Sequence, residues 1–246
     1  MSSPKAVVFT DWDGTVTLLD SNDYLTDNLG MGKESRVAIG NQILNGEVDF
    51  RTGFAEELQS VKLPFDQCID FLLKNIELDP GFKDTYEWCY ANNVPIYVIS
   101  SGMKPIIETL LVKLVGQDAM DNITIISNDV KINDDGSWDI VYRDDTSFGH
   151  DKALSILEVL DKLNLDKDAA KRSIPLFYCG DGVSDLSAAR ETDLLFARKG
   201  RELITYCEKE KVPYTEFESF DEILKSIQAI LSGEKKLADF IQNKSN

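Results

Sequence analysis

The chain has 246 residues, and its 43 acidic and 26 basic residues give a formal net charge of -17. We expect no nucleic-acid partner, because proteins that bind nucleic acids usually carry a basic surface that neutralises phosphates. The same charge argues against docking on anionic lipid, and no apolar run approaches the roughly 20 residues of a membrane-spanning helix. A small anionic ligand would also be repelled unless a cation screened its site.

The N-terminus and the cysteines predict a cytoplasmic protein. The chain starts with Met-Ser-Ser-Pro-Lys, enters an apolar run at once and shows no signal-peptide pattern. Its four cysteines stand far apart without a C-x-x-C pair, which predicts buried reduced thiols rather than a zinc or redox motif. The single histidine, His150, argues against a histidine-based zinc site and leaves a Ser-His-Asp triad only one candidate base. We therefore expect the chemistry to depend on carboxylates.

Short apolar runs alternate with helical patterns along most of the chain. The predicted strands are 6–9, 94–100, 123–127, 174–179 and 194–197. The predicted helices are 103–115, 150–163, 184–191, 200–210 and 220–231, and a helix followed by a frayed tail is expected over 235–246. Residues 131–142 predict a β-hairpin, because an Asp-Asp-Gly turn separates two short alternating runs. Continuous apolar strands between amphipathic helices are typical of an α/β fold with a Rossmann-like parallel sheet covered by helices on both faces.

The stretch 16–80 breaks this alternation. It has no clear strand, and its apolar residues recur at helical spacing, as in Phe54, Leu58 and Val61. We interpret it as a small helical cap inserted after the first strand, which leaves 1–15 and 81–246 for the α/β core. Such a segment could cover a site at the carboxyl ends of the strands, where open α/β sheets bind ligands.

Two acids, Asp11 and Asp13, directly follow the first predicted strand in the run D-W-D-G-T. If the chain bends at Gly14, both carboxylates can face one site. One of them could then attack an electrophile while the other transfers protons. An Asp-Gly turn between two solvated acids is the alternative.

A second pair of acids, Asp181 and Asp185, follows the predicted strand 174–179 in the run G-D-G-V-S-D. Carboxylate oxygens that leave room for water are the ligands Mg²⁺ prefers. In a plain Gly-rich turn, Asp185 would compensate the dipole of the next helix. That alternative leaves Asp181 unexplained.

Two further features suit an anion such as phosphate. The predicted strand 94–100 ends in Ser100-Ser101-Gly102 and opens a helix, whose N-terminus offers a hydroxyl and free N–H groups. Serine is also an ordinary N-cap residue. Lys152 lies in the first turn of a predicted helix, where a positive charge is unfavourable, so we expect an anionic partner for it. A solvated surface lysine is the alternative.

Taken in order, D-x-D-G-T, S-S-G, a helix-opening lysine and G-D-x-x-x-D each follow or flank a strand of one parallel sheet. With these four motifs the sequence resembles the haloacid dehalogenase-like (HAD) phosphatases, in the phosphoserine-phosphatase-like branch with a helical cap, over nearly the whole chain. The resemblance implies that Asp11 is a nucleophile that forms an aspartyl-phosphate. It implies that Asp13 protonates the leaving oxygen and then deprotonates the attacking water.

The resemblance also implies the binding residues. The phosphoryl group would be held by Ser100, Ser101, Gly102 and Lys152. Mg²⁺ would be held by Asp11, the Asp13 carbonyl and Asp181, with Asp185 nearby. The acid at position 13 points to phosphate chemistry, because dehalogenases of this superfamily need no proton donor there.

The predicted cap suggests the substrate. Candidate substrate contacts there are Asp20, Asn22, Asp23 and Arg51. Phosphoserine phosphatases have a cap arginine for the substrate carboxylate where this sequence has Ala55, and this difference argues against phosphoserine. Because the cap has 12 acidic and 5 basic residues, we favour a small sugar or polyol phosphate, followed by an amino-alcohol phosphate.

A Mg²⁺-dependent phosphatase acting on such a phosphomonoester is therefore the main hypothesis. A phosphosugar mutase on the same core is one alternative, and it would pass the phosphoryl group to a second sugar hydroxyl while the cap excludes water. A non-catalytic HAD-like binding module is the other. The sequence does not predict an oligomeric state.

Overall fold

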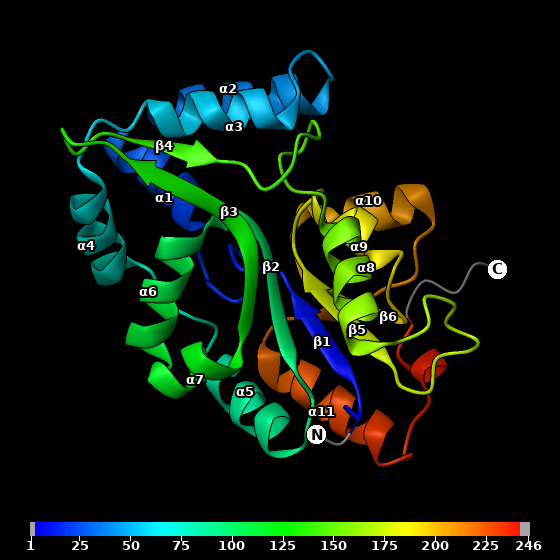
Figure 1. Ribbon diagram of the computed structural model, residues 1–246. Helices are drawn as coiled ribbons and strands as arrows, with labels where there is room; N and C mark the ends of the chain where they lie inside the picture. Colours follow the sequence, from blue (N-terminus) through cyan, green and yellow to red (C-terminus); the bar gives the residue numbers. More distant parts are fainter. Residues whose placement is uncertain (1–2, 242–246) are drawn as a thin grey trace.

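A seven-stranded sheet forms the centre of the computed structural model, which describes residues 3–241 (Figure 1). The strands are β1 (Val7–Thr10), β2 (Ile96–Met103), β3 (Thr124–Ile132), β4 (Trp138–Val141), β5 (Leu176–Gly180), β6 (Leu194–Arg198) and β7 (Thr215–Phe217). They lie in the order β4-β3-β2-β1-β5-β6-β7. All neighbouring strands are parallel except β3 and β4, which form an antiparallel hairpin. The first strand is therefore at the centre of the sheet, with β2 and β5 on either side.

Helices cover both faces of this sheet. They are α5 (Phe82–Ala91), α6 (Lys104–Leu114), α7 (Gln117–Asn122), α8 (Lys152–Leu163), α9 (Asp185–Ala189), α10 (Glu202–Glu210) and α11 (Phe220–Leu231). Helices α5, α6 and α11 pack on one face, and α8, α9 and α10 pack on the other. Alternate residues of β1 join the two cores, with Val8 on the first face and Val7 and Phe9 on the second. The predicted α/β fold is confirmed.

Four further helices lie between β1 and α5 and form the cap. They are α1 (Ser21–Leu29), α2 (Lys33–Leu44), α3 (Phe50–Gln59) and α4 (Phe65–Asn75). In Figure 1, α2 and α3 lie above the β3–β4 hairpin. The hairpin contacts the cap directly, since the Trp138 indole N–H donates to the Leu63 carbonyl at 3.1 Å and the Tyr142 hydroxyl donates to the Arg51 carbonyl at 2.6 Å. The cap helices and the hairpin that contacts them thus come from two separate parts of the sequence.

Most predicted elements are present, and the differences have simple reasons. The predicted strand 123–127 and the first arm of the predicted hairpin are one continuous strand, β3. Helices α5 and α7 and the strand β7 were not predicted, and β7 has only three residues. Of the predicted C-terminal helix, residues Leu237–Asp239 form one turn of 3₁₀-helix. The end of the predicted tail, 242–246, lies outside the described residues.

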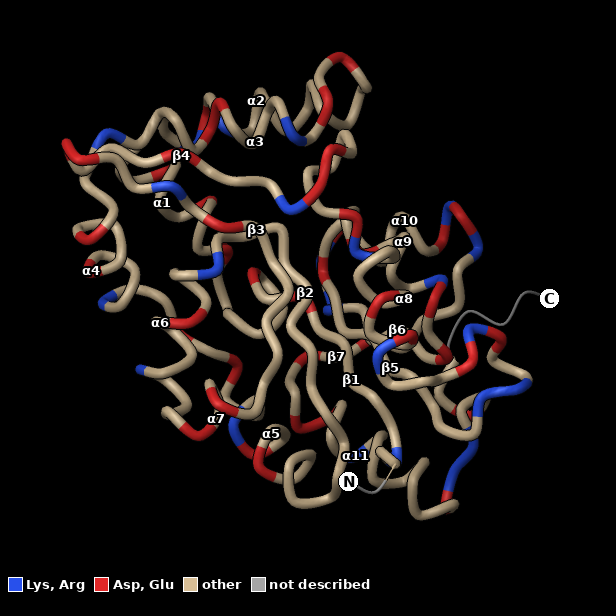
Figure 2. The backbone as a smooth tube through the Cα atoms, viewed as in Figure 1, with Lys and Arg blue, Asp and Glu red and all other residues tan. Residues whose placement is uncertain are grey.

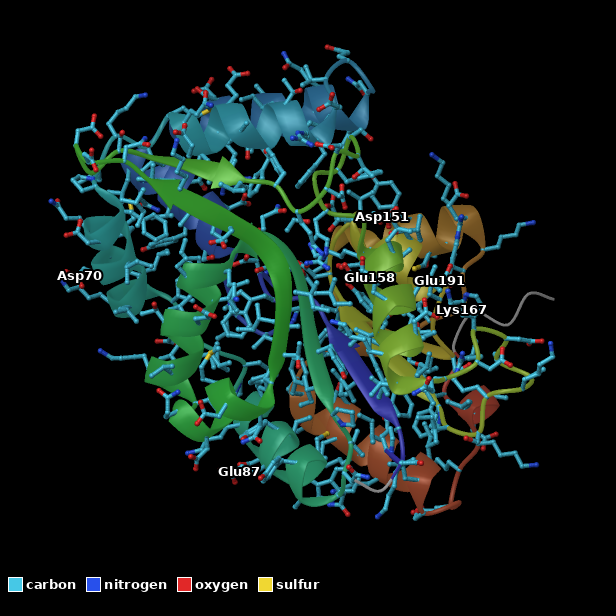
Figure 3. All side chains as sticks on the ribbon, viewed as in Figure 1. Asp70, Glu87, Asp151, Glu158, Lys167 and Glu191 are labelled. Carbon is cyan, nitrogen blue, oxygen red and sulfur yellow. The ribbon has the colours of Figure 1, made fainter. Side chains whose placement is uncertain are left out.

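Acidic residues are spread over core and cap alike (Figure 2). Asp70 on α4, Glu87 on α5 and Glu158 on α8 are exposed and point outward (Figure 3). Among residues 3–241, no helix is long and apolar enough to cross a membrane. The negative charge of most of the surface therefore needs no role beyond contact with water, and the acids that demand an explanation are the buried ones.

Candidate active site

The predicted motifs meet in a cavity of about 530 Å³ at the carboxyl ends of β1, β2 and β5. Asp11, Asp13, Ser101, Gly102, Lys152 and Asp181 line it from the core. Residues of α1, α2 and α3 line it from the cap. The cavity is therefore shared between the two predicted domains, as expected for a cap that covers the edge of a parallel sheet.

Lys152 is an interior cation. It lies at the start of α8, directly after Asp151 (Figure 3), whose side chain caps the helix by accepting from the N–H groups of residues 153 and 154. The Lys152 ammonium donates at 2.7 Å to both Asp11 Oδ1 and Asp185 Oδ1, and only 1% of the residue is exposed. Burial by itself lowers the pKa of Lys152, but the two carboxylates outweigh it and raise that pKa above the ordinary value. The alternative of a solvated surface lysine is excluded.

Asp11 lies just beyond the end of β1 and is almost fully buried. Its burial raises the pKa of its carboxyl to about 7, against the opposing effect of Lys152. Lys152 occupies one carboxylate oxygen, Oδ1. Only 7% of the residue is exposed, and it lines the cavity, so Asp11 is placed where a nucleophile would meet a ligand.

Asp13 is held by the cap rather than by the core. Its Oδ1 accepts from the Ser21 backbone N–H at 2.8 Å and from the Ser21 hydroxyl at 2.6 Å, and its Oδ2 accepts from the Asn22 amide at 2.9 Å. Burial, and next the nearby Asp20 carboxylate, raise the pKa of Asp13 well above its ordinary value. The raised pKa keeps a proton on this carboxyl group to higher pH than on an ordinary aspartate, which suits a general acid. Both acids of the D-x-D pair are buried at one site, so the alternative of two solvated acids in a turn is wrong.

Three carboxylates form a cluster suited to a cation. Asp11, Asp181 and Asp185 bring one oxygen each to within 4.8 Å of one another. Asp181 has weak compensation, with the Thr15 hydroxyl at 3.5 Å and the Arg201 guanidinium at 3.9 Å. Burial, followed by the charge of Asp11, raises its pKa well above the ordinary value. This all-oxygen set with excess negative charge fits a hard divalent cation such as Mg²⁺.

Gly14 leaves room for Asp181. Its φ of 74° is a left-handed conformation, and a Cβ built there would lie 2.2 Å from Asp181 Oδ2. By contrast, Asp185 is already saturated: its Oδ1 accepts from Lys152 and from the Tyr178 hydroxyl, and its Oδ2 accepts from two backbone N–H groups. Asp185 therefore orients Lys152 and the loop after β5.

The predicted phosphate loop lies in a strand rather than at a helix N-terminus. Strand β2 continues through Ser100, Ser101 and Gly102 with a register shift against β3, and α6 begins only at residue 104. Ser100 Oγ accepts from the Gly102 N–H at 3.0 Å, whereas the buried Ser101 Oγ has no protein partner although Ser101 lines the cavity. A Cβ on Gly102 would lie 2.7 Å from Asp13 Oδ2, so glycine keeps the approach to Asp13 open.

His150 supports this loop from behind. Its Nδ1 lies 2.7 Å from the Ser100 carbonyl, which can only accept, so Nδ1 carries the proton and Nε2 accepts from the Ser155 hydroxyl at 2.8 Å. Burial lowers the pKa of His150 to about 4. The one histidine is thus a neutral positioning residue, and the structure gives no Ser-His-Asp triad in residues 3–241.

The predicted cap residues separate into two groups. Asp20 and Asn22 line the cavity: Asp20 is the N-cap of α1, and Asn22 holds Asp13. Asp23 also lines it and pairs with Arg36 at 2.7 Å. Arg51 was predicted to contact substrate, but it lies outside the cavity. Its guanidinium donates to the Asp144 carbonyl at 2.7 Å and stacks over the Tyr142 ring, so it joins the cap to the loop before α8.

Three residues that line or support the cavity were not predicted from the sequence: Ser21, Arg36 and Glu57. Ser21 is the nearest hydroxyl to Asp13, and Arg36 and Glu57 face the cavity from α2 and α3. No local pattern distinguishes them from exposed residues of an amphipathic helix. Only the docking of the cap on the core brings them to the site.

Residues 8–190 match the family model of the haloacid dehalogenase-like hydrolases. The chain belongs to this family. It is 53% identical over 239 residues to a polyol phosphate phosphatase of Saccharomyces cerevisiae, and the match covers 97% of this chain and 99% of the relative. It is 49% identical to Pdp3-interacting factor 1 of Schizosaccharomyces pombe, over 91% of this chain and 95% of that protein. A 2-hydroxy-3-keto-5-methylthiopentenyl-1-phosphate phosphatase of Bacillus cereus is 30% identical, with 91% and 96% covered.

Solved structures share the fold. A substrate-bound phosphoserine phosphatase superposes with a TM-score of 0.69 at 17% identity and covers 92% of this chain and 99% of its own. A HAD family hydrolase from Salmonella enterica serovar Typhi superposes with a TM-score of 0.71 at 17% identity, covering 98% of this chain and 72% of its own. The predicted family and the predicted enzyme class, a hydrolase of phosphoric monoesters, are confirmed.

Proposed function

We propose that this chain is a Mg²⁺-dependent phosphatase that hydrolyses a small polyol monophosphate through an aspartyl-phosphate on Asp11. The observation that carries the proposal is the pairing of two buried carboxyl groups at one cavity. Asp11 contacts the Lys152 ammonium, and Asp13 is held in a site that favours its protonated form. One group is thus suited to attack and the other to proton transfer.

The cation would be held by Asp11, Asp181 and the Asp13 backbone carbonyl, with Asp185 behind them. When bound, it supplies positive charge that offsets the repulsion between a carboxylate and a phosphate and polarises the phosphoryl oxygens. The remaining positive charge comes from Lys152. The hydroxyl of Ser101, which has no hydrogen-bond partner among residues 3–241, would add a donor for the phosphoryl oxygens.

In the first step, a carboxylate oxygen of Asp11 attacks phosphorus, and the bond from phosphorus to the ester oxygen breaks. The electron pair of that bond leaves with the ester oxygen, which receives the proton of Asp13. Ser21 and Asn22 hold Asp13 in place for this transfer. The alcohol product departs towards the cap.

In the second step, Asp13 is a carboxylate and takes a proton from a water molecule. The water oxygen attacks phosphorus, the bond from phosphorus to Asp11 breaks, and inorganic phosphate forms. Asp11 returns as a carboxylate and Asp13 returns protonated, so both residues are restored for the next turnover. Splitting the hydrolysis in two suits a reaction whose uncatalysed rate is among the slowest known.

The cap supports a polyol substrate. Its wall has an acidic, polar part, where Asp20, Asn22 and Asp23 face the cavity, and an apolar part made by residues of α2 and α3. Hydroxyl groups can donate to the three polar residues. Sugar phosphates and then amino-alcohol phosphates rank after polyol phosphates. The yeast relative, which matches nearly the whole chain, is named a polyol phosphate phosphatase. A cytoplasmic location fits such a metabolite-directed enzyme.

The test is phosphate release from a panel of polyol, sugar and amino-alcohol monophosphates, with EDTA and after Mg²⁺ is restored. We expect release from polyol phosphates that EDTA abolishes and Mg²⁺ restores. The Asp11→Asn variant should lose activity and keep its circular dichroism spectrum. Metal-independent release, or full activity in Asp11→Asn, would refute the mechanism, and isomerised sugar phosphate without free phosphate would favour a mutase.

A further inference from the structure

Glu57 is a largely buried residue of the cap whose carboxylate opens to the cavity and has no protein partner among residues 3–241. It lies on α3, lines the cavity and is only 8% exposed. In the described range 3–241, its carboxylate has no hydrogen-bond partner and no ion-pair partner within 4.0 Å. Buried carboxylates normally have a partner, because an unpaired one is costly. The free partner sites of Glu57 therefore face the space that a ligand would fill.

Asn22 gives a second, independent sign of a ligand in the same wall. Its amide nitrogen is committed to Asp13 Oδ2, which fixes the orientation of the side chain. Among residues 3–241, its Oδ1 is buried and has no partner, and the residue lines the cavity. This wall thus contains an unsatisfied acceptor oxygen on Asn22, and Glu57 presents unpaired carboxylate oxygens that a ligand with hydrogen-bond donors would satisfy.

The one cap cation at the cavity, Arg36, is already paired with two carboxylates. Arg36 binds Asp27 through Nε at 2.7 Å and Nη2 at 3.1 Å, and it binds Asp23 through Nη1 at 2.7 Å. All three faces of the guanidinium fork are therefore already used by carboxylates. A carboxylate that reaches this part of the cap would find Arg36 already paired and would face Glu57.

We propose that Glu57 determines specificity by accepting hydroxyl groups of the substrate and repelling a second acidic group. This inference rests on the proposed phosphatase function. It assigns the distal part of the substrate to neutral, hydroxyl-rich chemistry and excludes carboxylate-bearing phosphates of the same length.

The environment of Glu57 agrees with binding to neutral hydroxyl groups. Burial raises the pKa of Glu57 to about 7, which exceeds the lowering by Arg36. Near neutral pH its carboxyl group can therefore both accept a hydrogen bond from a hydroxyl and donate one to it. Its neighbour on the same helix, Glu56, is exposed and does not line the cavity.

The experiment compares glycerol 3-phosphate with 3-phosphoglycerate, which differ only in a terminal hydroxymethyl or carboxylate group. Binding is measured by calorimetry with Mg²⁺ on the Asp11→Asn protein, so the readout does not need turnover. At pH 8.5, where a carboxyl group with a pKa of about 7 is ionised, the isosteric change Glu57→Gln in that background should narrow the affinity ratio of the two compounds by about tenfold, as expected when one like charge is removed. The matched control Glu56→Gln should leave the ratio unchanged.

The same ratio is then measured as kcat/KM in the otherwise wild-type enzyme. A smaller ratio of the two kcat/KM values in Glu57→Gln, with an unchanged ratio in Glu56→Gln, supports the inference. An unchanged affinity ratio in a folded Glu57→Gln protein, or an equal change in Glu56→Gln, overturns it. If the wild type does not hydrolyse polyol phosphates at all, the proposed function fails, while the binding ratio still decides the role of Glu57.

Discussion

The pH dependence of stability tests the buried network behind the phosphate loop. His150 is 2% exposed, donates to the Ser100 carbonyl and accepts from Ser155. Burial lowers its pKa from 6.5 to about 4. The unfolded chain therefore takes up a proton at this site at a higher pH than the folded chain does, and folding becomes less favourable as pH falls below about 6.5.

The size of the effect follows from the two pKa values. One pKa unit corresponds to about 1.4 kcal/mol, so the full loss between pH 6.5 and pH 4 is about 3 kcal/mol. At pH 5 the folded protein should have lost about 2 kcal/mol through His150 alone. Above pH 7, His150 is neutral in both the folded and the unfolded chain, so it contributes no pH dependence to the free energy of unfolding.

His150→Asn is the matched variant, because its amide nitrogen can still donate to the Ser100 carbonyl while the titratable group is gone. We expect the variant to be less stable than the wild type at pH 7.5, since the contact with Ser155 is lost. Urea unfolding at pH 7.5 and pH 5.0 should show that this difference shrinks by about 2 kcal/mol at the lower pH. Other acids titrate in both proteins and cancel in the comparison. Parallel pH profiles would show that His150 is not buried in its neutral form.

Three further changes test the site. Asp181→Asn should raise the melting temperature in EDTA, because it removes one charge from the three-carboxylate cluster. It should also abolish the stabilisation that Mg²⁺ gives the wild type. A lower melting temperature of the variant in EDTA would contradict this reasoning. Gly14→Ala should weaken Mg²⁺-dependent stabilisation and cost about 1–3 kcal/mol of stability. Gly46→Ala is the control for backbone strain alone, because Gly46 has a φ of 73°, close to the 74° of Gly14, and open space around its Cβ. This control should leave the response to Mg²⁺ intact. Ser21→Ala should lower kcat about tenfold for alkyl phosphates and much less for an aryl phosphate, because only the alkoxide needs the proton of Asp13. Equal losses on both substrates would show that Ser21 has only a structural role.

The chemistry of the core was readable because it lies next to the strands that carry it. Asp11 directly follows β1, and Asp181 directly follows β5. In a parallel sheet all such ends meet at one edge, so local sequence is enough to predict that these carboxylates converge. Lys152 was predicted for a similar reason, since a lysine in the first turn of a helix calls for a nearby anion.

The cap was predicted as a helical insertion, but its contacts were not. Arg51 was expected at the substrate and instead holds the loop before α8, while Glu57, six residues further along the same helix, faces the cavity. Both lie in an amphipathic segment, and which side meets the core depends on packing between segments that are distant in sequence. The contact of Trp138 with Leu63 is of this kind.

The sequence by itself therefore determined the family, the parallel α/β core and the set of candidate catalytic carboxylates, because each depends on residues next to a strand end. Only the tertiary structure determined which hydrogen bonds and ion pairs those groups make. Ser21 and Asn22 reach Asp13 only because α1 docks over the sheet edge, and Arg36 is neutralised only because two carboxylates from α1 lie against α2. The negative charge of -17 also takes its meaning from this arrangement. Most acids face water, whereas a few buried ones meet at the cavity, where we propose that they hold a cation and accept hydroxyl groups of the substrate.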